Sequence, residues 1–190
     1  GLQKLMAPLV EAAGYPPNSI AIRIIIDPNY NAFVAGEKII YVHSGLILKA
    51  RSTEEILGVL AHEIGHLKAG HVPRRDAAIA DANSATALAA LAAIAVAAGG
   101  GGDAAVGVLI GGQDQVVRKL LRTSRHDEAV ADEIGLSLLD KSGISANALR
   151  DMMQRMAAQR ALPESRQSPY YKTHPDAAKR LSIYQDHINR

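Results

Sequence analysis

Two histidines and a glutamate stand close together in the segment His62-Glu63-Ile64-Gly65-His66. Positions four apart lie on one face of a helix, so His62 and His66 can bind the same metal ion. Glu63 directly follows the first histidine, where its carboxylate can reach a metal-bound water instead of the metal. A metal lowers the pKa of such a water toward about 7, and a nearby carboxylate then takes its proton. The spacing predicts a hydrolytic metal site with Glu63 as general base.

The alternative is that both histidines lie on a charged, solvated helix face. Apolar neighbours argue against it, because they make most of this helix a buried one: Ile56, Val59, Leu60, Ile64 and Leu67. Two histidines and a glutamate in a buried helix need partners. The metal site is therefore the favoured interpretation.

A catalytic zinc site has three protein ligands and keeps one position open. His71 follows His66 by five residues, about 140° around a helix, so it fits a structural or supporting role better than a ligand role. Glu128 is the better candidate, and Asp132 follows it by four residues. One of this acidic pair could bind the metal while the other holds a ligand histidine through its second ring nitrogen. Acidic pairs at this spacing are also common on solvated faces, so spacing alone leaves the choice open.

Three further segments extend the histidine pattern along the chain. The four segments are Asn31-Ala32-Phe33, residues 62–66 with His71, residues 124–135, and Thr173-His174-Pro175-Asp176 with Arg180. Together they resemble the HtpX and CAAX prenyl protease family of zinc metallopeptidases, in the order expected of that family. The resemblance covers most of the chain and is more specific than the first motif alone.

The resemblance implies one zinc ion per chain, bound by His62, His66 and Glu128, with Glu63 as general base. Asp132 would orient a ligand histidine, namely His62. His174 and Arg180 would stabilise the oxyanion of the tetrahedral intermediate, the task of preorganised donors in acyl transfer.

The same resemblance assigns the substrate to the first segment. Asn31, Ala32, Phe33 and Val34 would present backbone groups to an extended protein or peptide substrate, which would add to the sheet edge as a strand.

The flanking sequence predicts the elements that must position these residues. Apolar periodicity and turn residues predict a helix from Leu2 to the turn at Gly14 and three strands over Ile20–Ile26, Ala32–Val34 and Lys38–Val42. The predicted later helices are one from the capping box of Ser52 and Glu55 to about His71, one over Gln115–Leu139, one marked by Leu149, Met152, Met153 and Met156, and one opened by Pro175. Residues Ala161–Thr173 are predicted to form a polar loop.

Residues 77–112 are rich in alanine and glycine and predict a helical hairpin. The uncharged window 82–102 is long enough to span a bilayer, but alanine and glycine contribute little hydrophobicity. A packed hairpin is therefore favoured over a transmembrane span, with peripheral membrane contact left open.

Composition limits the class of protein. The chain has 190 residues, of which 48% are hydrophobic and 21% charged, as in ordinary globular domains. A net charge of +2 and the lack of a basic run exclude a nucleic-acid-binding surface, and the lack of cysteine excludes thiolate metal sites. The predicted fold is α+β: a single, mainly helical, zincin-like metalloprotease domain over residues 1–190, with a small antiparallel sheet beside the active-site cleft.

The predicted function is that of a zinc-dependent metalloendopeptidase acting on proteins. The resemblance, without a clear membrane span, implies a periplasmic or membrane-associated location in a bacterium. Two alternatives stay open: a latent protease or chaperone-like factor whose site is closed until a partner docks, and a structural helical protein with incidental histidines.

Overall fold

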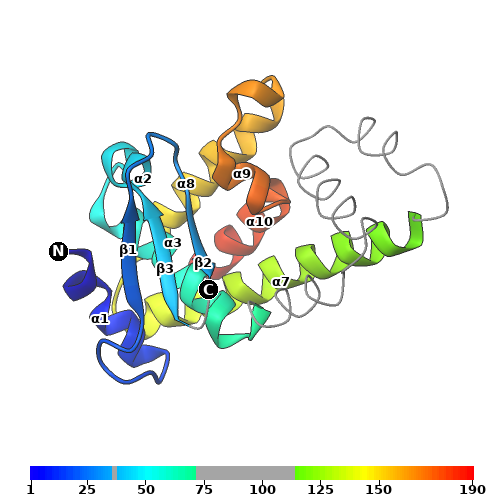
Figure 1. Ribbon diagram of the computed structural model, residues 1–190. Coiled ribbons are helices and arrows are strands. Elements are labelled where there is room, and N and C mark those ends of the chain that lie inside the picture. Colours follow the sequence, from blue (N-terminus) through cyan, green and yellow to red (C-terminus); the bar gives the residue numbers. More distant parts are fainter. Residues whose placement is uncertain (36–37, 72–113) are drawn as a thin grey trace.

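A three-stranded sheet packs against a group of helices in the computed structural model, which describes residues 1–35, 38–71 and 114–190 (Figure 1). The strands are β1 (Ala21–Ile25), β2 (Ala32–Ala35) and β3 (Ile39–His43), in the order β1-β3-β2. The α+β class and all three predicted strands are confirmed, with boundaries that differ by one residue at most ends.

The prediction of an antiparallel sheet is wrong for one of its two strand pairs. β2 pairs with β3 in antiparallel register, but β1 pairs with β3 in parallel register, Ile22 opposite Ile40. The chain reverses direction twice between β1 and β3, so these two strands point the same way. Because β3 lies between the other two strands, it pairs with β1 directly, and the sheet is mixed.

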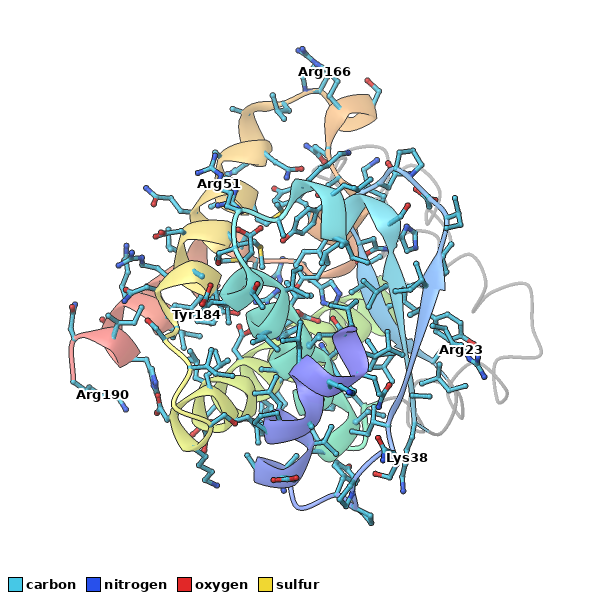
Figure 2. The ribbon with its side chains drawn as sticks, turned by 90° about the vertical axis from the view of Figure 1, so that its left-hand side faces the viewer. Arg23, Lys38, Arg51, Arg166, Tyr184 and Arg190 are labelled. Atoms are coloured by element: carbon cyan, nitrogen blue, oxygen red, sulfur yellow. The ribbon has the colours of Figure 1, made fainter. Side chains whose placement is uncertain are left out.

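The two faces of the sheet differ in their side chains, as period-two alternation requires. One face buries Ala32, Val34, Ile40 and Val42 against the helices, and each of these residues is at most 2% exposed. On the opposite face the rings of Phe33 and Tyr41 stack with their centroids 5.3 Å apart. Arg23 extends away from the helices, which lie on one side of the sheet when it is seen edge-on (Figure 2).

The helix that carries the histidine motif is α3 (Thr53–Lys68), which lies beneath the sheet and is buried at every position from Leu57 to Gly65. The hydroxyl of Ser52 accepts the Glu55 backbone N–H at 3.2 Å, as the predicted cap requires. In a complete capping box the Glu55 side chain would accept the Ser52 backbone N–H. Here one of its oxygens accepts the Arg51 backbone N–H instead. The helix ends three residues before the predicted end, because Gly70 adopts φ +67°, a conformation that stops helices.

The other helices surround α3. They are α1 (Leu2–Ala12), α2 (Ser44–Lys49), α7 (Asp114–Lys141), α8 (Asn147–Ala158), α9 (Pro169–Thr173) and α10 (Ala177–Ile188), with short 3₁₀ turns at Gln159–Ala161 and Glu164–Arg166. The buried apolar residues of the described ranges form one cluster, which includes the three methionines of α8.

The structure corrects two sequence predictions near the C-terminus. Residues predicted as a polar loop contain α9, which begins where Ser168 accepts the Tyr171 N–H and Pro169 occupies the first turn. Pro175 does not open the last helix. The next residue, Asp176, has a left-handed conformation with φ +68°, and α10 begins after it at Ala177.

The predicted hairpin over residues 77–112 lies outside the described residues. None of the helices in the described ranges combines the length and apolar character needed to cross a lipid bilayer.

Candidate metal centre

The histidine motif occupies the buried middle of α3. His62 and Glu63 are almost completely buried, and His66 is one turn further along the same face. Glu128 and Asp132, also buried and one turn apart, face them from α7. The predicted i, i+4 pairs therefore meet across two crossing helices.

Two glycines allow α3 and α7 to cross this closely. A Cβ on Gly65 would lie 2.4 Å from the carbonyl oxygen of Ala131, and one on Gly135 would lie 3.2 Å from the backbone of Ala61 and His62. Helix axes approach to this distance only where side chains are absent at the crossing. The glycines within both motifs therefore bring the histidines to the carboxylates.

Four side-chain donor atoms converge at the crossing. The group comprises His62, His66, Glu128 and His174, and its donor atoms all lie within 4.8 Å of one another. The Nε2 atoms of His62 and His66 are 3.0 Å apart, and each is 3.2 Å from an oxygen of Glu128.

This donor set fits a zinc ion. Imidazole nitrogens and a carboxylate oxygen are ligands that zinc prefers, and two histidines with one glutamate form a known type of catalytic set. One oxygen of Glu63 is buried and makes no hydrogen bond to the described residues, with Nε2 of His174 lying 3.5 Å away. A buried, unpartnered carboxylate oxygen beside such a set suits a group that receives a proton from a bound water.

Asp132 lies beside His62, the histidine that the resemblance leads us to expect it to orient. The Nδ1–H of His62 donates to Asp132 at 2.8 Å, which turns Nε2 toward the other donor atoms. Arg180 clamps the same carboxylate with two bonds of 2.7 Å, and the hydroxyl of Tyr184 also donates to it. Asp132 is thus held by three donors and in turn holds His62.

His71 supports the second histidine. Its Nδ1 lies 2.9 Å from Nδ1 of His66, and its Nε2 lies 3.4 Å from Asp127 on α7. The residue lies outside the group of four donors, in accordance with its angular position, and it contacts the nitrogen of His66 that faces away from them.

The positive charges in this cluster shift the pKa values of Asp132 and Glu128 downward. Burial alone would raise the pKa of Asp132, but the charge of Arg180 and the bond from His62 outweigh it and lower the value to about 2. Burial likewise opposes ionisation of Glu128, whose pKa nevertheless falls well below 4.5 because His174 and Arg180 are adjacent. Both carboxylates are therefore anionic at neutral pH, as metal binding and histidine orientation require.

The two histidines of α3 respond in opposite directions. Burial and the charge of Arg180 oppose protonation of His62, yet its bonds to Asp132 and Glu128 raise its pKa to about 9. Burial lowers the pKa of His66. Metal binding would therefore displace a proton from His62, since only the neutral imidazole is a ligand.

His174 enters the donor cluster from the turn between α9 and α10. Its Nδ1 lies 3.1 Å from Glu128 and 3.3 Å from Nε2 of His62, and its Nε2 lies 3.5 Å from Glu63. The residue is 6% exposed. Its imidazole is thus close enough either to act as a ligand or to donate to a group bound beside the metal.

Arg180, which is predicted to share the oxyanion role with His174, contacts different groups. Besides clamping Asp132, its Nη1 lies 2.8 Å from Glu128 and contacts the His174 carbonyl at 3.5 Å. The guanidinium therefore faces two carboxylates: Asp132, which holds His62, and Glu128, which is in the donor group.

The predicted substrate segment forms the edge strand β2, which packs on α3 (Figure 1). The side chains of Ala32 and Val34 point into the core, whereas Phe33 lies on the opposite face. Asn31 precedes the strand and is buried.

Tyr184 is a functional residue that sequence reasoning missed. Its spacing of four from Arg180 places both residues on one face of α10 and is the only sequence signal that could have indicated a shared partner.

Comparison with known proteins finds several proteases that are similar to this chain. The chain is 32% identical over 176 residues to a putative beta-barrel assembly-enhancing protease of Vibrio cholerae, an alignment that covers 92% of this chain and 36% of that protein. It is 31% identical over 183 residues to the metalloprotease LoiP of Escherichia coli, covering 93% of the chain and 64% of LoiP. It is 26% identical to the mitochondrial metalloendopeptidase OMA1 of Schizosaccharomyces pombe, covering 95% of the chain and 50% of that relative.

The chain thus spans between about a third and two thirds of the length of these relatives. The model of peptidase family M48 matches residues 1–186, nearly the whole chain and every part of the donor cluster. The protein belongs to peptidase family M48.

Proposed function

We propose that this chain is a zinc-dependent metalloendopeptidase domain, with one zinc bound by His62, His66 and Glu128. The observation that supports it most directly is the convergence of two imidazoles and a carboxylate from α3 and α7, each oriented by a further residue. The finer assignment to the HtpX and CAAX prenyl protease branch and the single domain over residues 1–190 stay predictions.

A zinc ion held by His62, His66 and Glu128 would polarise the scissile carbonyl and lower the pKa of a bound water, so that a nearby base could remove its proton. Glu63 accepts the proton of the attacking water on its unpartnered oxygen and later passes it to the leaving amine. His174, 3.5 Å from Glu63, donates to the developing oxyanion. Arg180 positions the ligand Glu128 directly and the ligand His62 through Asp132, which departs from the oxyanion role expected from the resemblance.

The substrate is proposed to be a protein or peptide that binds in extended form along Asn31–Val34. This segment is supported by its place in an edge strand packed on α3. The names of the bacterial relatives, beta-barrel assembly-enhancing protease among them, support substrates in the bacterial envelope, and hence a periplasmic or membrane-associated location.

The test compares casein cleavage by the zinc-loaded chain, by the chain after chelation, and by Glu63→Gln. Glu63→Gln should keep stoichiometric zinc but lose turnover by about 10²-fold or more, because only the general base is removed. A zinc-loaded Glu63→Gln chain that cleaves casein near the wild-type rate would refute the proposal. A chain that does not retain zinc at all would support incidental histidines instead.

A second candidate function, a latent protease, is favoured by the position of His174 within the donor group. If this imidazole occupies the fourth zinc position, water and substrate are excluded until a partner displaces it. A chain that holds zinc but cleaves casein only when His174 is displaced would support latency. Chelator-sensitive cleavage by the isolated chain would exclude it.

A further inference from the structure

Glu55 is a second buried carboxylate on α3, two turns before His62, and none of the proposed chemistry uses it. It is 1% exposed. Its Oε1 accepts the Tyr30 hydroxyl at 2.9 Å and lies 2.6 Å from Nη2 of Arg155 on α8. Its Oε2 accepts the Arg51 backbone N–H at 3.3 Å. Through these contacts Glu55 joins the segments that carry Tyr30, Arg51 and Arg155.

Tyr30 connects this cluster to the C-terminal part of the site. Its ring meets the ring of Tyr170 edge-on, with centroids 6.0 Å apart, and its carbonyl accepts the Tyr170 N–H at 3.4 Å. Both rings are buried. Tyr30 thus contacts Tyr170 through its side chain and through its backbone.

Tyr170 in turn supports His174. Their ring centroids are 4.3 Å apart with an interplanar angle of 31°, and the Tyr170 carbonyl accepts the His174 N–H at 2.9 Å. The Nε2 of His174 is buried and makes no hydrogen bond to the described residues. Packing against Tyr170 therefore restricts the orientation of the imidazole ring.

We propose that Glu55 and Tyr30 are positioning residues for His174. The hydrogen bond between them fixes the Tyr30 ring, Tyr30 fixes Tyr170, and Tyr170 holds the imidazole beside Glu63 and Glu128. The inference rests on the proposed function, in which His174 donates to the oxyanion. Displacement of a donor by about 1 Å can lower turnover by as much as about 10²-fold, so a contact remote from the metal can control the rate.

The competing explanation is a purely structural one, in which Glu55 only joins the start of α3 to α8. Helix capping does not require the side chain, because Ser52 already accepts the Glu55 N–H. Both explanations predict lower stability when the cluster is disturbed. They differ in whether the effect on the rate passes through His174.

The kinetic test uses Tyr30→Phe, which removes one hydroxyl, with Tyr15→Phe as matched control, since Tyr15 lies away from the cluster under Lys38. Tyr30→Phe should lower kcat about tenfold with KM unchanged, and Tyr15→Phe should change neither. In a His174→Ala background, Tyr30→Phe should cause no further loss. The inference is overturned if kcat is unaffected in the wild-type background, or falls by the same factor in both backgrounds.

A second variant reports on the carboxylate. Glu55→Gln keeps an acceptor for Tyr30 but weakens the contact with Arg155, so its kcat should fall in the same direction by a smaller factor. Asp151→Asn is the matched control. Asp151 also pairs with an arginine of α8, Arg150, but this ion pair is exposed. A Glu55→Gln chain with wild-type kcat would contradict the inference even if Tyr30→Phe failed to fold.

A third readout needs no activity. In the NMR spectrum of the intact chain, the Tyr170 ring current should shift the His174 ring protons, which are identified by their loss in His174→Ala. Tyr30→Phe should move these resonances and Tyr15→Phe should not. If the wild-type chain cleaved no substrate, the proposed function would fail while this experiment still decided the inference. Unmoved His174 resonances in Tyr30→Phe would refute it.

Discussion

Glu128 and His174 contribute donor atoms to the same cluster, yet they are proposed to have different functions. Glu128 is the proposed third zinc ligand, whereas His174 is proposed to donate to the substrate's oxyanion. Glu128→Ala should therefore lose zinc on dialysis against a mild chelator, because two imidazoles alone do not complete the set. His174→Ala, the matched comparison, should retain zinc. Metal analysis after dialysis measures both, and full stoichiometry in Glu128→Ala would overturn the ligand assignment.

The hydroxyl of Tyr184 is connected to the proposed ligand His62 through Asp132. Tyr184→Phe removes one of three donors to a buried carboxylate and should reduce zinc affinity by about 10- to 100-fold, as changes behind the ligands commonly do. The free energy of unfolding should fall by about 1–3 kcal/mol, because the buried carboxylate of Asp132 loses a hydrogen-bond donor.

Competition with a metal indicator measures this change in affinity. Tyr41→Phe is the control, since Tyr41 stacks on Phe33 on the far face of the sheet. Equal zinc affinities for Tyr184→Phe and Tyr41→Phe would show that Arg180 alone holds Asp132.

At the scale of elements, the site depends on how closely α3 and α7 cross. Gly65→Ala would place a methyl group 2.4 Å from a backbone oxygen of α7, so that helix must move and carry Glu128 away from the histidines. We expect zinc affinity to fall by at least about tenfold, which is the smallest loss typical of changes to residues that support metal ligands.

Gly58→Ala is the matched control on the same helix. Its methyl group would lie 2.8 Å from the Cβ of Leu149, so α8 must shift, but α8 supplies none of the four donor residues. Both substitutions gain about 1 kcal/mol of helix propensity, so that term cancels. Zinc titrations of the two variants distinguish them, and equal affinities would mean that the crossing tolerates a side chain.

At the scale of the whole molecule, the metal would join α3, α7 and the turn before α10, which are far apart in sequence. A ligand that binds only the folded state stabilises it by about 2.7 kcal/mol at a concentration about 100 times its Kd. For a chain of this size that corresponds to an increase in Tm of roughly 5–10 °C.

Thermal unfolding with zinc or with chelator measures the shift. Glu63→Gln should show the full shift, since the general base does not bind the metal, and Glu128→Ala should show little or none. A chain whose Tm does not respond to zinc would indicate that the donor cluster is held by its own ion pairs.

The chemistry of this site was predictable because it is encoded locally. The i, i+4 spacings of His62 with His66 and of Glu128 with Asp132 place each pair on one helix face wherever the helices lie. The same holds for the Ser52 cap and for the alternation of the strands. The resemblance to a metallopeptidase family connected the two pairs, which spacing alone could not do.

The arrangement that only the tertiary structure decided depends on contacts between distant segments. The direction of β1 relative to β3 follows from strand order, which no local pattern encodes. Glu55 has the spacing of an ordinary capping residue, but Tyr30 and Arg155, from separate elements, make it a buried junction. Arg180 belongs to the expected motif, yet its guanidinium pairs with Asp132 and Glu128. A buried cation needs anionic partners, and the fold places these two carboxylates beside it. The sequence by itself determined which residues share a helix face; the packing of α3, α7 and α10 determined what those faces contact.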